Sequence, residues 1–188
     1  MVKKKRACIF ISGSGTNFRS ILKNSREYNF PINISLVVSN KRNAVGLNYA
    51  KKFSIPYIVI EKNMKKFEKI VLKEIICRKI SLICLAGFMR ILSKNFIRNF
   101  KGRIINIHPS LLPKYKGLNT FARVIKNKEK YTGCTVHFVD EKLDNGLIIV
   151  KKKILIKKND NAEILKQKVQ LQEYNAYSMA IRKIYAVN

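Results

Sequence analysis

Short β-rich apolar runs alternate with helix-length segments along the first hundred residues, and this alternation constrains the fold more than any other feature. In the third helical segment, apolar residues recur at helical spacing, at Phe67, Ile70, Val71 and Ile75. Strands separated by helices of this size predict a parallel sheet with helices on both faces. The expected strands are 7–12, 32–39, 57–60, 82–85 and 103–107, and the expected helices are 17–24, 44–53, 64–78 and a segment from a Ser93 cap to about Phe100.

The final third of the chain has a different pattern. Two longer β-rich runs, 135–139 and 147–156, flank the segment DEKLDNG, and its Asn145-Gly146 pair is typical of an antiparallel connection. A last helix over 162–184 places Leu165, Val169, Ala176 and Ala180 on one stripe. No internal repeat or linker interrupts the chain, so we expect one domain over residues 1–188.

Composition excludes several classes of protein. With 188 residues and 47% hydrophobic content, the chain can bury a real core, so intrinsic disorder is excluded. No apolar run approaches the roughly 20 residues of a membrane helix. The basic start is followed by a short apolar stretch and then by the turn SGSG, whereas an export signal has a longer apolar region that ends in a cleavage site. The four cysteines form no CxxC pair and there are only two histidines, which argues against zinc and for buried free thiols. We therefore expect a cytoplasmic protein without a metal site.

A formal net charge of +28 is the strongest compositional signal. One interpretation is a surface for nucleic acid or another polyanion. The other is drift toward codons rich in A and T, because Lys, Asn and Ile are abundant together. The lysines are scattered and do not alternate with aromatic residues, as a stacking platform for single strands would require. We favour drift combined with a general attraction for anionic substrates.

A glycine-rich turn, SGSGTN at 12–17, follows the first expected strand and precedes the first expected helix. Backbone N–H groups in such a turn, together with the helix N-terminus, form an anion site that glycine lets a phosphate approach. The turn lacks the Gly-Lys-Ser/Thr of a P-loop and the third glycine of the dinucleotide fingerprint. The alternative is a plain turn in which Thr16 or Asn17 caps the helix.

Polar residues also gather at the end of a later strand. Asn106 and His108 point to the same face of that strand, and Pro109 keeps His108 extended and ends the strand. Open α/β sheets bind ligands where parallel strands end, although ordinary hydrogen bonds at a strand end would give the same pattern. Asp144 precedes Asn-Gly and on local evidence is a turn former. His137 lies in an alternating strand, which favours a satisfied core histidine.

The segments SGSGTN, LAGFMRIL, GRIINIHPSLLPKYKG, TGCTVHFV and LDNG resemble, in this order and spacing, those of the glycinamide ribonucleotide formyltransferase family. The resemblance extends from about Cys8 to Gln172-Glu173. It implies a Rossmann-like α/β domain with a mostly parallel sheet of about seven strands, helices on both faces and an antiparallel C-terminal strand. It also implies a phosphate-binding half, 1–100, and a folate-binding and catalytic half, 101–188.

The same resemblance implies an activity and its residues. The enzyme would transfer a formyl group from the co-substrate 10-formyltetrahydrofolate to glycinamide ribonucleotide in purine synthesis, as a monomer or homodimer without membrane, metal or specific nucleic-acid partners. Asn106 and His108 would stabilise the oxyanion, and His108 would later protonate the leaving folate nitrogen. Asp144 would pair with His108 and accept the amine proton, possibly through water. The remaining roles follow the family pattern: Gly15, Thr16 and Asn17 hold the phosphate, Glu173 lies near the amine, and Met89, Arg90, Ile91, Leu92, Asn106, Val139, Asp140 and Asp144 bind the folate.

The sequence departs from the family pattern at three positions. Asn119 stands where the family usually has histidine, Phe121 follows it, and Met64 replaces a basic residue used for the folate tail, for which Lys65 or Lys66 could substitute. Two alternative functions remain. A methionyl-tRNA formyltransferase would suit the charge but has a longer chain and lacks this first loop. A non-enzymatic nucleic-acid-binding protein gives no reason for NIHPSLLP.

Overall fold

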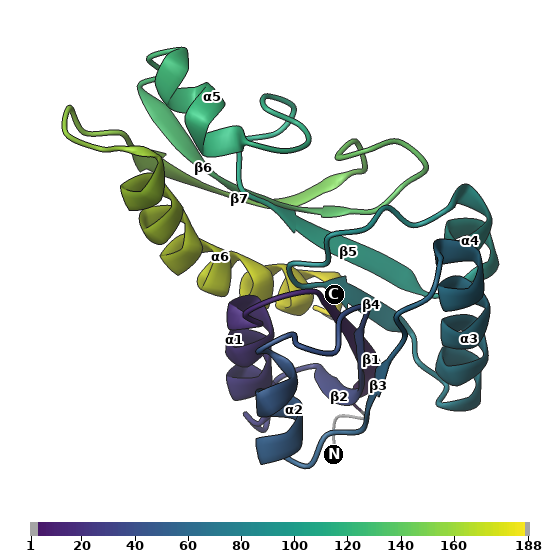
Figure 1. The fold of residues 1–188 in the computed structure, drawn as a ribbon. Helices are drawn as coiled ribbons and strands as arrows, with labels where there is room; N and C mark the ends of the chain where they lie inside the picture. The colour runs from purple at the N-terminus through teal and green to yellow at the C-terminus, as the bar shows by residue number, and fades with distance from the viewer. Residues whose placement is uncertain (1–3, 187–188) are drawn as a thin grey trace. The chain divides into compact units, whose positions relative to one another are not determined.

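The structure, a computed structural model, describes residues 4–186 and confirms the predicted α/β class. Seven strands form one sheet in the order β3-β2-β1-β4-β5-β6-β7 (Figure 1). The elements along the chain are β1 (Lys5–Ile11), α1 (Thr16–Ser25), β2 (Ile32–Ser39), α2 (Leu47–Lys52), β3 (Tyr57–Val59), α3 (Met64–Cys77), β4 (Leu82–Leu85), α4 (Lys94–Asn99), β5 (Arg103–His108), α5 (Thr120–Lys126), β6 (Tyr131–Phe138), β7 (Ile148–Leu155) and α6 (Ala162–Ile184).

Internal contacts divide the chain into two compact units, and the division falls inside β5. The first unit ends at Ile105 and the second begins at Asn106. The sequence suggested halves that meet at 100/101. That a single domain spans the whole chain stays a prediction.

The first unit is a parallel sheet covered on both faces. β1 pairs in parallel with β2 and β4, and β2 pairs in parallel with β3. The helices α1 and α2 lie on one face of these strands, and α3 and α4 lie on the other (Figure 1). The chain runs outward from β1 to β2 and β3 and then returns to β4 on the other side of β1. The carboxyl ends of β1 and β4 therefore flank a topological switch point, which is where sheets of this kind bind ligands.

Continuous apolar strands explain why the sheet of the first unit is buried on both faces. Ala7 to Ile11 of β1 and Leu82 to Cys84 of β4 have no exposed surface, which is the pattern of parallel strands covered on both sides. On α3, Phe67, Val71 and Ile75 are fully buried as predicted, but Ile70 is 41% exposed. The predicted stripe on that helix was therefore too wide by one residue.

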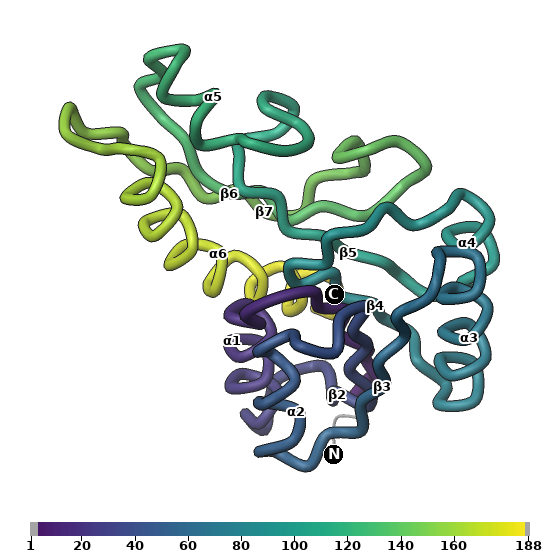
Figure 2. Tube along the Cα trace, viewed as in Figure 1, coloured from purple at the N-terminus to yellow at the C-terminus, as the bar shows by residue number. Residues whose placement is uncertain are grey.

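The second unit builds an antiparallel ribbon covered by the last helix. β6 and β7 are antiparallel, and their register shifts between Val136 and His137. The helix α6 packs on both strands, and Figure 2 traces it from the end of β7 back along the ribbon. Leu165, Val169, Ala176 and Ala180, the stripe expected from the sequence, are all fully buried.

Three sequence expectations are corrected here. The short helix α5 was not expected, since no side chain caps its first turn and its N-cap, Asn119, is left-handed with φ 56. β6 begins at Tyr131, four residues before the expected start at Thr135. Cys77 is exposed at the end of α3, whereas the other three cysteines are buried, and all four are free thiols.

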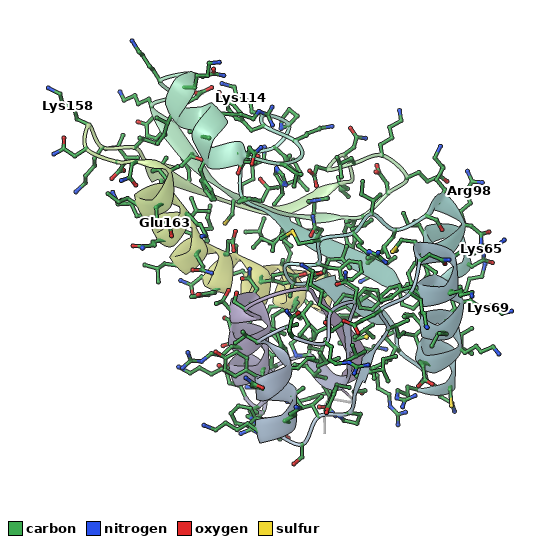
Figure 3. All side chains as sticks on the ribbon, viewed as in Figure 1. Lys65, Lys69, Arg98, Lys114, Lys158 and Glu163 are labelled. Carbon is green, nitrogen blue, oxygen red and sulfur yellow. The ribbon has the colours of Figure 1, made fainter. Side chains whose placement is uncertain are left out.

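Positive charge is spread over the exposed faces of both units. Lys65 and Lys69 on α3 and Arg98 on α4 project outward from the first unit, and Lys114 and Lys158 do so from the second (Figure 3). Within residues 4–186, no helix combines the length and the apolar character needed to cross a membrane.

Candidate active site

A buried histidine–aspartate pair lies at the carboxyl end of β5. His108 is the last residue of the strand, and its Nδ1 lies 3.2 Å from Oδ2 of Asp144, which comes from the β6–β7 connection. Both side chains are more than nine-tenths buried. Asn106, two residues earlier on β5, is half-buried. The structure therefore brings together the three residues that the sequence analysis singled out.

The loop after β5 holds this pair through its backbone. His108 Nε2 donates to the carbonyl oxygen of Tyr115 at 2.8 Å, and the N–H of Gly117 donates to Asp144 Oδ2 at 2.9 Å. Both ring nitrogens of His108 thus face acceptors, a carboxylate and a carbonyl. Nε2 carries a proton, because the Tyr115 carbonyl can only accept.

A second histidine belongs to the same cluster, although the pattern around it predicted only a core residue. His137 on β6 is 2% exposed, and its Nε2 lies 3.7 Å from Asp144 Oδ1 and 3.4 Å from Asn106 Nδ2. Its Nδ1 donates to the carbonyl of Phe138 at 2.8 Å, so Nε2 of the neutral ring accepts from the Asn106 amide. Burial lowers the pKa of His137 below its ordinary value, which keeps the ring neutral.

The register shift in the ribbon explains how His137 comes to lie in the cluster. The shift falls between Val136 and His137, and bulges of this kind re-aim side chains beside functional sites. Alternation along β6 predicted only that His137 is buried. No sequence signal located the shift, so the pattern could not show that His137 meets Asp144.

An aspartate side chain makes hydrogen bonds within the β6–β7 connection. Asp140 does this, because its two carboxylate oxygens accept from the Lys142 N–H at 2.9 Å and from the Asn145 amide at 3.3 Å. Asp144 has a left-handed backbone, φ 46, and turns its carboxylate inward. Gly146 completes the connection, since a Cβ there would lie 1.8 Å from the carbonyl oxygen of Phe138. Asp144 therefore lies in the turn, as its place before Asn-Gly predicted, and its carboxylate also meets His108.

The glycine-rich turn of the first unit lies at the topological switch point. It lines a cavity of about 280 Å³ together with Lys41 and with Ala86, Gly87 and Met89 from the end of β4. Gly15 is left-handed, φ 70, and its Cα would not admit a Cβ, which would meet Gly46 Cα at 2.5 Å. Gly15 is also the N-cap of α1 and no side chain caps that helix, so the plain capped turn is wrong.

The segment after β4 exposes apolar side chains. Met89 and Ile91 are 69% and 71% exposed, whereas Leu92 is buried. Arg90 Nη1 donates to the carbonyl of Lys62 at 2.7 Å and lies 3.6 Å from Met64 Sδ. The Met64 side chain therefore contacts the arginine of this segment.

The other predicted residues lie in the second unit. Val139 and Asp140 are half-buried at the end of β6. Glu173 is half-buried on α6, and its charge, after burial itself, contributes to raising the pKa of the Cys134 thiol to about 12. Asn119 is exposed and Phe121 half-buried at the start of α5. Among the residues described, no cluster of three or more His, Cys, Asp or Glu could hold a metal ion.

Comparison with known proteins identifies the family. The family model described as "Formyl transferase" matches residues 5–181. The chain is 39% identical over 182 residues to the phosphoribosylglycinamide formyltransferase of Haemophilus influenzae, covering 95% of this chain and 86% of that protein. It is also 39% identical over 189 residues to the trifunctional purine biosynthetic protein adenosine-3 of Homo sapiens, covering 97% of this chain.

Coverage differs between these relatives. The chain spans only 14–18% of the length of the trifunctional proteins it matches. The crystal structure of the phosphoribosylglycinamide formyltransferase of Brucella melitensis superposes with a TM-score of 0.91 at 37% identity, covering 99% of this chain and 97% of that one. A family match over nearly all of its residues and relatives of this similarity show that the chain belongs to the formyl transferase family.

Proposed function

We propose that this chain transfers the formyl group of 10-formyltetrahydrofolate to the primary amine of glycinamide ribonucleotide in de novo purine synthesis. The products are formylglycinamide ribonucleotide and tetrahydrofolate. Family membership and the names of the similar proteins support the reaction. The observation that carries the proposal is the buried His108–Asp144 pair, with its 3.2 Å separation, beside Asn106.

The chemistry calls for groups of this kind. The amine nitrogen bonds to the formyl carbon, the bond from that carbon to the folate nitrogen breaks, and one proton passes from the amine to the leaving nitrogen. The carbonyl oxygen carries negative charge in between. Preorganised N–H donors stabilise such an oxyanion, and each contributes roughly a hundred- to a thousand-fold in rate.

His108 and Asn106 are the proposed donors. His108 Nε2–H donates to the neutral Tyr115 carbonyl, and an oxyanion is the stronger acceptor for the same proton. Asn106 uses its amide nitrogen toward His137, and its second N–H stays available as a donor. Asp144, held by His108 and Gly117, would accept the amine proton, directly or through water.

The substrate phosphate would bind the turn of the first unit. Gly15, Thr16 and Asn17 line its cavity with Lys41, so backbone N–H groups, the α1 N-terminus and an ammonium group favour an anion there. The exposed Met89 and Ile91 are suited to an apolar wall for the folate, with Arg90 and Leu92 beside them.

The remaining assignments rest on the family pattern. Val139, Asp140, Asn106 and Asp144 would also contact the folate, and Glu173 would lie near the amine. Lys65 and Lys66, both exposed, are the candidates to replace the missing cation at Met64. A cytoplasmic location and a monomeric or homodimeric state belong to this proposal as well, with no metal and no specific nucleic-acid partner.

A formyl-transfer assay with two acceptors side by side tests the reaction. We expect turnover with glycinamide ribonucleotide and none with initiator methionyl-tRNA, and the reverse result would move the chain to the methionyl-tRNA branch. His108→Ala, Asn106→Ala and Asp144→Ala should each lower kcat at least about a hundred-fold with KM largely kept. Asp160→Asn, which removes a carboxylate outside this cluster, is the matched control for Asp144→Asn. Near-normal turnover of Asp144→Asn would remove Asp144 from the reaction.

A further inference from the structure

We infer that Tyr115 and Arg123 are positioning residues that hold the backbone of residues 115–117 where it clamps His108 and Asp144 together. The inference rests on the proposed function, because it assumes that this pair carries the reaction. It assigns a task to Arg123, which lies outside the motifs that point to formyl transfer.

The clamp consists of one backbone carbonyl, which accepts a hydrogen bond, and one backbone N–H, which donates one. The carbonyl of Tyr115 accepts from His108 Nε2, and two residues later the N–H of Gly117 donates to Asp144 Oδ2. The histidine requires an acceptor and the carboxylate a donor, and one short segment supplies both. A displacement of this segment therefore changes both members of the pair at once.

The segment is bent in a way that needs support. Tyr115 and Gly117 both have left-handed backbones, with φ 57 and φ 78. A tyrosine rarely adopts this conformation because its Cβ crowds the backbone. Such a residue keeps its conformation only when surrounding contacts determine it.

Arg123 supplies one anchor from α5. Its Nη1 donates to the carbonyl of Lys116 at 2.7 Å and to that of Leu118 at 3.3 Å, so it bonds the chain on both sides of Gly117. Its guanidinium carbon also lies 5.3 Å from the centre of the Tyr115 ring, which is within cation–π range.

The hydroxyl of Tyr115 supplies the second anchor. It donates to Glu129 Oε1 at 2.9 Å and accepts from Asn127 Nδ2 at 2.9 Å. Glu129 is held in turn by Lys114, at 2.9 Å from the same oxygen. The tyrosine is thus fixed at both ends, through its carbonyl at the site and through its hydroxyl away from it.

On one side, this segment borders a cavity rather than packed side chains. A cavity of about 340 Å³, lined in part by Tyr115, Val124 and Glu129, lies beside it. Side chains next to a cavity lack close-packed neighbours on that side. Removing the polar anchors should therefore loosen the segment while the fold of the unit is kept.

Arg123→Met tests the first anchor, because it removes both donors and keeps an unbranched side chain on α5. We expect kcat to fall about tenfold with KM within about twofold, as expected for hydrogen bonds from a charged donor. Tyr115→Phe, which removes only the hydroxyl, should act in the same direction, and Arg123→Lys should restore part of the loss. The matched control is Lys126→Met, which removes an exposed cation from the same helix and should leave kcat unchanged.

A second readout does not depend on activity. The chain has only two histidines, so ¹⁵N-histidine labelling gives two imidazoles, and His137→Gln assigns them. The His108 nitrogen signals should shift or broaden in Arg123→Met and stay in place in Lys126→Met. Thermal unfolding identifies any variant that fails to fold. If Tyr115→Phe fails to fold, Arg123→Met alone tests the inference, because Arg123 is exposed and its replacement should leave the fold intact.

The outcomes separate the two proposals. If the parent formylates glycinamide ribonucleotide but Arg123→Met matches Lys126→Met in kcat and in the His108 signals, the positioning role is refuted. If the parent transfers no formyl group while the His108 signals still respond to Arg123→Met, the clamp stands and the proposed function fails.

Discussion

Replacing Gly15 by alanine tests whether the turn after β1 is built to admit an anion. Gly15 has φ 70, a conformation that costs an L-residue roughly 1–2 kcal/mol. A Cβ there would lie 2.5 Å from Gly46 Cα, closer than real contacts occur, and both partners are backbone, so the chain must shift. Strain of this kind costs about 1–3 kcal/mol. We therefore expect Gly15→Ala to lower the free energy of unfolding by about 2–5 kcal/mol.

The same shift should weaken binding of the ribonucleotide. Gly46 N–H donates to the carbonyl of Gly13 at 3.0 Å, so moving Gly46 opens the turn. Affinity for glycinamide ribonucleotide should fall at least about tenfold, because the backbone N–H groups no longer converge on the phosphate. Affinity for the folate should change little.

A neighbouring glycine provides the control. A Cβ at Gly13 would meet nothing within 4 Å, and its backbone is not left-handed. Urea unfolding and titration of both ligands compare Gly13→Ala with Gly15→Ala. If the two variants were equally stable and bound the ribonucleotide equally well, the steric argument would be refuted. Equal loss of both ligands in Gly15→Ala would make the turn merely structural.

Three further predictions concern pH, a buried carboxylate and charge. Burial lowers the pKa of His137 from 6.5. As the pH falls below 6.5, the unfolded chain binds a proton at this histidine before the folded chain does, so the free energy of unfolding decreases until the folded-state pKa is reached. Urea unfolding at about pH 7 and about pH 5 should show a smaller decrease in His137→Gln than in the parent. Glu68 accepts from the N–H and hydroxyl of Ser93 at 2.7 and 2.6 Å, and Glu68→Gln, which turns an amide N–H₂ toward these donors, should cost about 1–3 kcal/mol in the same assay. Duplex DNA, measured by fluorescence anisotropy, should bind weakly, without sequence preference, and dissociate by roughly 200 mM salt, as scattered lysines imply; binding that persists there would indicate a dedicated polyanion surface.

The bounds of several elements were predicted well because burying one or both faces of a helix or strand requires a regular pattern of apolar residues. The bounds of β2, β4 and α6 match the expected 32–39, 82–85 and 162–184. The Ser93 cap is present, since its hydroxyl accepts from the Phe96 N–H. The helix α5 escaped prediction because seven residues give too few turns for a period and its N-cap makes no side-chain bond. The start of β6 was missed because Gly133 interrupts the β-rich run.

Some features of the candidate site follow from local sequence, and others depend on contacts that only the folded chain makes. The position of Asn106 and His108 at a strand end follows from Pro109 and the apolar run before it. Asp144 lies in the turn that the following Asn-Gly predicts, but only the folded chain shows that its carboxylate meets His108 and that Asp140 makes the side-chain hydrogen bonds of the turn. The contact of His137 with Asp144 depends on a register shift between strands, which no local pattern encodes.

The partners of Asp144 differ from those of the carboxylates that pair with lysine in this basic chain. The sequence has 39 Lys and Arg residues and 11 acidic ones, so an ammonium group is the commonest partner at hand. Asp160, Glu129 and Glu163 do pair with lysines. Asp144 instead lies between two imidazoles and a backbone N–H. This environment suits the proposed role of Asp144 as the acceptor of the amine proton.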